Sequence, residues 1–565
     1  MSPTRSTRHR KLQVLAAATA VVALAAGCSD ANSKNNQEDR KAGAATGVLN
    51  IGMPNGPQTN NSNPFLGTSA ANSLGYRNVM YEPLVMTNPI KPAEKGKPWL
   101  ASAWTWSDNF TKVEFTVTDK AKWSDGKPLT AEDVAFTFQM IKDNKAINGN
   151  GIAYDGIESS GDKVTLTFKE SQFVNQNKIV STFVVPKHIW SKVKDPATEP
   201  NRKPIGSGPY VLKTFTPQTT TLVAAPSYWK GETKVKELRY TSYNDNSAQT
   251  TALASGKSEW SFVFLPDFKK LYIDKDPENH KLWFPSGLGI HGLWFNTTKK
   301  PFDDVAIRRA MEMVVDRHAI HIQAQATLYP EITNKTGIPQ PAGEPFLAPE
   351  YKDAKTTVDV EGAKKVLKDA GYKLKGGKLL DKSGKPITLT LTDPAGWNDY
   401  ITGLQMMAES WKELGIEAKV KTQTAEAWTS DVSNGKFDAT LHWTNSGATP
   451  YDLYQNVMDG ELLQPIGKAA QLGNFGRFDS PEATKALKEY ANAADDSART
   501  TALNTLQKIF VEQVPMIPTA AAPIGAEYST KNWVGWPDES NPYGSPQPTQ
   551  QNALEIVLNL KPAKK

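Results

Sequence analysis

A short apolar run near the N-terminus constrains this chain more than any other feature of its sequence. Residues 12–26 read LQVLAAATAVVALAA, follow four basic residues among positions 5–11, and end just before Cys28. A membrane-spanning helix needs about 20 predominantly apolar residues, so a run of 15 is better suited to a cleavable export signal. We therefore expect residues 1–27 to be a signal peptide and the rest of the chain to fold outside the cytoplasm.

Cys28 is the only cysteine of the chain, and the small residues Ala25, Ala26 and Gly27 precede it. This segment resembles the lipobox of bacterial lipoproteins, and the resemblance implies that the Cys28 thiol is acylated and anchors the protein. Leu is usual where Ala25 stands, and here Leu24 lies one residue earlier. The alternative is an ordinary secretory signal with a chance cysteine. Either way, no disulfide can form within the chain, so packing must supply its stability.

Length and charge limit the remaining possibilities. A chain of 565 residues is too long for one hydrophobic core, so at least two domains are expected. Loss of the four basic residues before Cys28 lowers the formal charge from +6 to +2, which implies no nucleic-acid partner. The 15 tryptophans suit core packing and also an aromatic-lined ligand cleft.

Residues 28–47 are expected to form a disordered tether. From 29 on they read SDANSKNNQEDRKAGAATG, with no aromatic or large aliphatic side chain that could bury apolar surface. At Val48 the sequence changes to VLNIGMP, which predicts a short strand. Ordered structure should therefore begin at Val48.

Helix signals alternate with strand signals along the rest of the chain. Thr130 and Asp133 form a capping box at the start of one helix, and Asp304 can cap another. A third helix is predicted over 398–414, with Gly415 as its stop. Strand-like alternation occurs at 113–117, 417–423 and 437–443. This alternation predicts an α/β protein with covered sheets.

Several segments together resemble one family, the class 5 extracytoplasmic solute-binding proteins of ABC importers, which capture oligopeptides, dipeptides and oligosaccharides. Each motif alone is weak, whereas their order and spacing are specific. The matching segments are NPF (63–65), YEPL (81–84), PWLASAWTWSDN (98–109), KWSDGKPLTAEDVAFTF (122–138), GSGPY (206–210), FNTTKKPFDDVAIRRAMEMVVDR (295–317) and PMIP (515–518).

The resemblance implies a two-lobed periplasmic-binding-protein type II fold with an inserted subdomain and a ligand cleft between the lobes. Lobe I would comprise residues 48–78, 205–294 and 518–560. The inserted subdomain would span 79–204, and lobe II would span 295–517. A chain that crosses between lobes in this way makes a hinge suited to closure around a ligand. The implied partners are an ABC permease with its ATPase, and the protein would act as a lipid-anchored monomer outside the cytoplasm.

Motifs for catalysis, cofactors or metals are weak. Residues 287–292 (GLGIHG) fit GxGxxG but precede a strand-like run, so we expect a bend between strands and no dinucleotide. His318 and His321 lack further ligands for a metal. No GxSxG elbow or acid/base pair is recognisable. We expect no cofactor and no enzyme; a surface hydrolase and a ligand sensor are the other classes considered.

The ligand class depends on one position of the resemblance. Peptide-binding members carry an Asp shortly after the strand that matches 437–443, where it pairs with the peptide's α-ammonium. Aligned on Trp443 and Pro450, that position is Ser446 here. A buried ammonium opposite a serine would lack a counter-charge, so an oligosaccharide is favoured and an oligopeptide is the alternative. The segment VGWPDESNPYGSP (534–546) also looks like the oligosaccharide-binding branch.

The predicted ligand-binding residues combine aromatic rings with amide and hydroxyl groups. Rings stack on the apolar face of a pyranose, while amides and hydroxyls pair with its OH groups. The alternative assigns Trp443 and Trp536 to the core and lets Glu82 meet a peptide amine. The predicted set is Trp443, Asn445, Ser446, Tyr451, Trp397, Phe65, Glu82 and Trp536.

Overall fold

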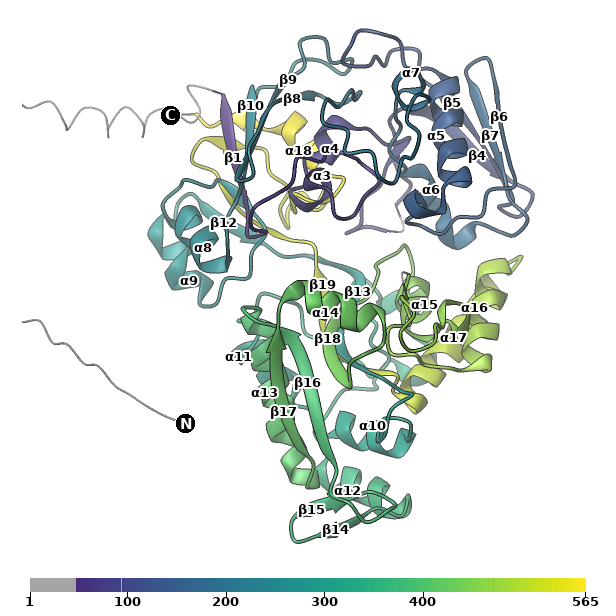
Figure 1. Ribbon diagram of the computed structural model, residues 1–565, viewed down its shortest axis with the longest axis vertical. Coiled ribbons are helices and arrows are strands. Elements are labelled where there is room, and N and C mark those ends of the chain that lie inside the picture. The colour runs from purple at the N-terminus through teal and green to yellow at the C-terminus, as the bar shows by residue number, and fades with distance from the viewer. Residues whose placement is uncertain (1–46, 93, 471, 565) are drawn as a thin grey trace, which may run out of the picture.

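The computed structural model describes residues 47–92, 94–470 and 472–564. The predicted signal peptide, Cys28 and positions 28–46 of the predicted tether lie outside the described residues. Gly47, expected to be the last tether residue, is instead buried, and its carbonyl accepts a hydrogen bond from the Lys236 N–H at 2.6 Å. The chain forms two lobes stacked one above the other in Figure 1.

Lobe I contains a seven-stranded sheet with the order β12-β20-β11-β1-β10-β9-β8. Strand β1 is parallel to both neighbours, β10 and β11. The strands are β1 (Val48–Met53), β8 (Tyr210–Phe215), β9 (Thr219–Ala224), β10 (Glu237–Ser242), β11 (Trp260–Ser261), β12 (His280–Trp283) and β20 (Ala526–Ser529). The helices that accompany this sheet are α3 (Ala70–Ser73), α4 (Arg77–Met80), α8 (Asn246–Ala254), α9 (Phe268–Leu271) and α18 (Ala553–Asn559).

The inserted subdomain has its own antiparallel sheet, in the order β4-β5-β7-β6. Alternate residues of β5 are buried, as expected for a sheet with one face covered. Its elements are β2 (Val85–Met86), β3 (Lys97–Pro98), β4 (Ala101–Ser107), β5 (Lys112–Val117), α5 (Ala131–Asp143), β6 (Gly156–Ser160), β7 (Lys163–Thr167), the 3-10 turn η3 (Phe173–Asn175), α6 (Gln176–Val180) and α7 (Lys187–Trp190). Figure 1 shows this subdomain beside lobe I and above part of lobe II.

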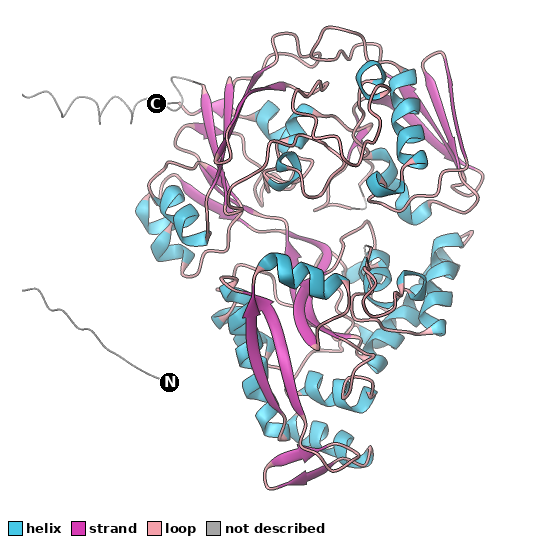
Figure 2. Ribbon diagram, in the orientation of Figure 1, coloured by secondary structure: helices cyan, strands magenta, loops and turns pink. Residues whose placement is uncertain are grey.

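Lobe II contains a five-stranded sheet with the order β17-β16-β18-β13-β19. Its strands are β13 (Ser286–Phe295), β16 (Thr388–Pro394), β17 (Glu417–Gln423), β18 (Ala439–Trp443) and β19 (Met516–Pro523), with the hairpin β14 (Lys373–Lys375) and β15 (Lys378–Leu380) at the far tip. Its helices are α10 (Val305–Met313), α11 (Arg317–Gln323), α12 (Val360–Asp369), α13 (Asn398–Trp411), α14 (Ala425–Ser433), α15 (Tyr451–Met458), α16 (Pro481–Asn492) and α17 (Asp496–Gln513). Figure 2 shows helices around this sheet.

The predicted helix ends are confirmed. Thr130 and Asp133 form the capping box of α5. The Asp304 carboxylate accepts from the Ala306 N–H at 2.9 Å and caps α10. After α13, a 3-10 turn over Lys412–Leu414 ends at Gly415, whose φ of 76° is a left-handed conformation that favours glycine.

The chain crosses between the lobes at two adjacent places. One crossing joins β12 to β13 and the other joins β19 to β20, and the Ile524 N–H donates to the Pro285 carbonyl at 2.9 Å. A Cβ on Gly525 would lie 2.4 Å from the Phe284 Cα, so the two crossings are in contact. The expected lobe boundaries at 294 and 518 fall inside β13 and β19, which are both strands of the lobe II sheet.

Separate hydrophobic cores support the two lobes. Lobe I and the inserted subdomain share one core cluster, and lobe II has two. A smaller cluster beside the crossings joins the lobes, because Leu265 and Tyr272 of lobe I pack with Tyr329 and Ala520 of lobe II. None of the described helices is both long and apolar enough to cross a membrane.

Candidate ligand cleft

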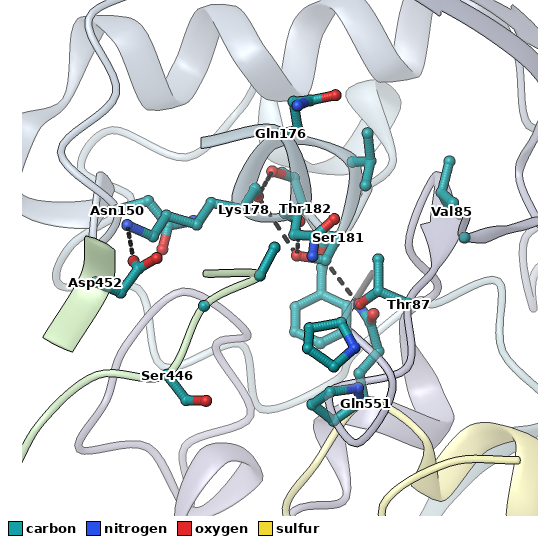
Figure 3. Close-up of a pocket in the computed structure, with 18 of the residues that line it drawn as sticks. Val85, Thr87, Asn150, Gln176, Lys178, Ser181, Thr182, Ser446, Asp452 and Gln551 are labelled. Atoms are coloured by element: carbon teal, nitrogen blue, oxygen red, sulfur yellow. Dashed lines mark hydrogen bonds and ion pairs between the residues drawn. The ribbon is translucent and has the colours of Figure 1, made fainter. Parts of the chain in front are cut away.

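A cavity of about 760 Å³ lies between lobe I with its inserted subdomain on one side and lobe II on the other. We call it the cleft pocket. Figure 3 shows that its side chains come from both sides, with Val85, Lys178 and Ser181 on one and Ser446 and Asp452 on the other. Residues far apart in the sequence therefore form one site, as expected for a binding cleft between two bodies.

The loop after β18 supplies the lobe II side of the cleft pocket. The Ser446 hydroxyl accepts from the Leu288 N–H at 3.0 Å, and the Thr444 hydroxyl accepts from the Ile290 N–H at 3.0 Å. A Cβ on Gly287 would lie 2.5 Å from the Ser446 hydroxyl oxygen. The loop is therefore fixed against β13.

The GxGxxG segment at 287–292 lies inside β13, which corrects the expected bend between strands. Its glycines allow close approach to neighbouring chains. A Cβ on Gly289 would lie 3.2 Å from the Asn445 carbonyl oxygen, and one on Gly292 would lie 2.5 Å from the Ile517 carbonyl oxygen. The strand continues through irregular pairing with β19, so the motif reflects packing on both sides of one strand.

An ion pair crosses the cleft pocket. The Lys178 ammonium of α6 lies 2.8 Å from the Asp452 carboxylate of α15, and the exposed fractions of these side chains are 25% and 3%. A Cβ on Gly447 would overlap the Asp452 carboxylate, so glycine leaves the space that this carboxylate occupies. Asp452 is not in the predicted ligand-binding set, because it lies beyond Pro450 in the alignment. Its position in the first turn of a helix that directly follows the cleft loop could have indicated that it reaches the cleft.

Aromatic rings form a floor beside the same loop. We call the cluster of His291, Trp397, Trp428, His442 and Trp443 the aromatic floor. Trp443 is 41% exposed, stacks on His442 at 4.3 Å, and lies 6.2 Å from the Trp397 ring. Asn445 and Ser446 are exposed next to it. The structure thus brings four predicted site residues together.

Burial sets the charge of the titratable groups around this floor. It lowers the pKa of His291 to about 3 and that of His442 to about 4, so both imidazoles are neutral near pH 7. Burial raises the pKa of Asp399 to about 6, although its carboxylate accepts a long hydrogen bond from the Tyr329 hydroxyl at 3.4 Å. The floor therefore presents apolar faces and neutral rings.

The other predicted residues have different surroundings. Phe65 lines the cleft pocket and meets the Trp190 ring edge-on at 5.6 Å. Tyr451 is buried and stacks on Tyr490 at 5.4 Å. Trp536 is buried against Tyr528.

Glu82 also lies in the interior and not at the cleft surface, where we expected it. Three donors surround its carboxylate: Trp99 Nε1 at 2.8 Å, the Tyr228 hydroxyl at 2.7 Å and Trp229 Nε1 at 3.1 Å. Core packing and these hydrogen bonds account for Tyr451, Trp536 and Glu82, and alternation or spacing in the sequence does not reveal such partners.

His318 and His321 each have a protein partner. His318 Nδ1 lies 3.1 Å from the Glu331 carboxylate, and His321 Nδ1 lies 2.9 Å from the Tyr329 carbonyl. Within the part of the chain that the structure describes, no group of three or more His, Cys, Asp or Glu side chains is placed to hold a metal ion.

Comparison with known proteins identifies this arrangement. The profile of “Bacterial extracellular solute-binding proteins, family 5 Middle” matches residues 95–461, which is more than half of the chain. The chain belongs to this family. Family 5 proteins are solute-binding components of ABC importers, so binding for transport is the family's role.

Relatives and solved structures extend the likeness over most of the chain. The oligopeptide-binding protein AppA of Bacillus subtilis is 27% identical over 514 residues, covering 86% of this chain and 89% of AppA. The periplasmic murein peptide-binding protein MppA of Escherichia coli is 26% identical, covering 78% and 81%. A periplasmic oligopeptide-binding protein of Thermotoga maritima, solved with bound mannohexaose, has a TM-score of 0.79 and 26% identity, covering 92% of this chain and 99% of that one.

Proposed function

We propose that this protein captures an oligomeric solute by lobe closure and delivers it to an ABC permease. The observation that carries this proposal is the cleft pocket, because both lobes contribute side chains to one cavity. Only a closed form lets both sides contact the same ligand, so ligand binding favours closure.

An oligosaccharide is the ligand class that we propose first. The exposed ring of Trp443 can stack on a sugar, and Asn445 and Ser446 follow it in the chain with polar groups for the sugar hydroxyls; of these three residues, Ser446 lines the cleft pocket. The Thermotoga maritima relative was solved with mannohexaose.

The carboxylates of the cleft pocket do not call for a cationic ligand, while Arg77 and Lys95 also line the pocket. Among the described residues that line it, the carboxylates are those of Glu94 and Asp452. Each has a lysine partner, Lys91 at 3.2 Å and Lys178 at 2.8 Å. Neither carboxylate is left without a counter-charge that a ligand would have to supply.

An oligopeptide is the second candidate, and Asp452 favours it. Its carboxylate lies at the cleft and already pairs with an ammonium group, that of Lys178. A peptide α-ammonium could take that place. The relatives AppA and MppA are named for oligopeptides and murein peptides.

A thermal-shift screen tests the ligand class. Gluco- and manno-oligosaccharides are compared with di- to pentapeptides, since a ligand at 100 times its dissociation constant adds about 2.7 kcal/mol of stability. A midpoint raised by sugars supports the first proposal. A midpoint raised by peptides alone replaces it with the second, and no response to either class contradicts both.

Trp443→Ala then tests the stacking role. We expect sugar affinity to fall about tenfold or more, because stacking and apolar contact are lost. The unliganded midpoint should change little, since the ring is 41% exposed. The control is Leu374→Ala, an exposed apolar residue of the distant β14–β15 hairpin. A large loss of unliganded stability without loss of affinity would assign Trp443 to the core.

We further propose that Cys28 anchors the protein to the cell membrane by acylation. The apolar run over 12–26 and the small residues before Cys28 support this proposal. Anchoring keeps the binding protein close to its permease.

A further inference from the structure

A second set of contacts joins the lobes far from the crossings. It lies between η3 and α6 of the inserted subdomain and α15, α16 and α17 of lobe II. Besides the Lys178–Asp452 pair, the Arg499 guanidinium lies 3.7 Å from the centre of the Phe173 ring. Phe173 also meets the Tyr490 ring at 6.2 Å with an interplanar angle of 62°. We call these contacts the clasp.

The clasp combines apolar burial with charge. Phe173 and Val174 pack against the lobe II core cluster that contains Tyr451 and Tyr490. Burial of an aromatic ring is favourable in itself and gains further from a cation over its face. A buried ion pair alone is close to neutral in free energy, because desolvation offsets attraction. Phe173 therefore supplies attraction, and the Lys178–Asp452 pair fixes how the two sides meet.

Every clasp contact joins protein to protein, so its strength does not depend on a solute. Separating the lobes would return the Asp452 carboxylate and the Lys178 ammonium to water and expose the Phe173 ring. Truncating one partner of the pair while the lobes stay closed leaves a buried charge without a partner. This penalty then raises the free energy of the closed form and not that of the open form.

We propose that the clasp holds a substantial fraction of the protein closed when no solute is bound. The cleft pocket is bounded by clasp residues Phe173, Lys178 and Asp452, so a solute reaches it after the clasp opens. The solute then supplies only part of the free energy of closure. Because the clasp stabilises the closed form with and without solute, it also influences the apparent affinity for the solute.

Distance measurements on the ligand-free protein test this proposal. Donor and acceptor dyes are attached at Ser159→Cys in the inserted subdomain and Thr501→Cys in α17, two exposed positions, on a Cys28→Ala background. Single-molecule energy transfer then reports the ratio of open to closed molecules. We expect a short-distance population in the parent protein.

Two variants should shift this ratio towards the open form. Lys178→Met should shift it about tenfold or more, since it leaves Asp452 unpaired only in the closed form. Phe173→Ala should shift it in the same direction through lost burial. The matched control is Lys187→Met, whose ammonium pairs with Glu132 inside the inserted subdomain and does not reach lobe II.

The outcome is independent of the ligand class, because no solute is added. A shift in either clasp variant that Lys187→Met lacks supports the proposal. It is overturned if the parent protein is wholly open, or if both clasp variants match the control. Circular dichroism confirms that each variant is folded, and Phe173→Ala supplies the test if Lys178→Met does not fold.

Discussion

Glu82 has no exposed surface and lies between α4 and β2, where three parts of the chain meet. Trp99 of the inserted subdomain and Tyr228 and Trp229 of lobe I donate to its carboxylate. Burial raises the pKa of Glu82, and the donors counteract this effect. The Glu82 carboxylate therefore links the inserted subdomain to lobe I through hydrogen bonds.

Glu82→Gln should destabilise the protein by about 2 kcal/mol, because the amide NH₂ would face groups that are themselves donors. Chemical denaturation measures the change. The control is Glu132→Gln at an exposed ion pair, for which we expect little effect. Altered solute affinity with unchanged stability would contradict the structural role and point to ligand binding.

Asp399, which lies near the aromatic floor, makes the stability of the protein depend on pH. Burial raises its pKa to about 6 in the folded protein, against about 3.9 in an unfolded chain. Between these values the folded state holds a proton that the unfolded state has lost. The contribution of Asp399 to the free energy of unfolding is therefore favourable below pH 4 and falls as pH rises to 6.

Asp399→Asn should abolish this fall in the free energy of unfolding, because the amide does not ionise. At pH 7.5 we expect the variant to be about 1 kcal/mol more stable than the parent, after discounting for partial exposure, and at pH 3.5 the two should be alike. Thermal midpoints at both pH values measure this. The neutral histidines of the floor are common to both proteins, so their own pH dependence cancels. Glu409→Gln, an exposed change on the same helix, should show no such difference.

Elements defined by local signals could be predicted from the sequence. The capping box of α5 and the Asp304 cap of α10 lie within a few residues of the helix starts that they fix. Features set by distant neighbours could not. The glycines of β13 are explained by the loop after β18 and by β19, which come more than 140 residues later.

Local signals indicate which loop borders the cleft, but they do not indicate which distant residues meet it. Trp443 is exposed at the end of β18 and Ser446 is exposed in the loop after it, and of these two Ser446 lines the cleft pocket. Asp452 enters the site because it meets Lys178, and this contact depends on how the inserted subdomain and lobe II are placed relative to each other. Composition cannot separate an exposed Trp443 from a buried Trp536, since both are aromatic residues beside polar loops.

Strand β13 gives a test of the packing explanation for its glycines. Gly292→Ala places a Cβ 2.4 Å from the Met516 side chain and 2.5 Å from the backbone carbonyl of Ile517. Met516 can move, but the backbone of β19 cannot without loss of sheet pairing. We expect a loss of about 2 kcal/mol in the free energy of unfolding.

Urea denaturation of Gly292→Ala and of Gly67→Ala checks this expectation. Gly67 has open space around its Cα, so its substitution should change stability by less than about 0.5 kcal/mol. Equal effects of both substitutions would show that β13 and β19 can separate at little cost.

At the scale of the whole molecule, the lobes are connected on two sides. The paired crossings near Pro285 and Ile524 form one connection and the clasp forms the other, with the cleft pocket bounded by clasp residues. The crossings are covalent and hold the lobes together in any state, whereas the clasp consists of side-chain contacts that can separate. In the lobe closure that we propose, opening would therefore proceed by rotation about the crossings.

The proposed attachment of this two-lobed body to the cell surface rests on Cys28, which precedes the described residues. Cys28→Ala should release the protein from the membrane while leaving its thermal midpoint and solute binding unchanged, because Cys28 precedes the first described residue by 19 positions. A single acyl chain binds a membrane weakly, whereas two or more hold it firmly. Cell fractionation with immunoblotting measures the change, and Ser29→Ala is the matched control. If the Cys28→Ala protein stayed with the membrane, the apolar run at 12–26 would be the anchor, retained uncleaved.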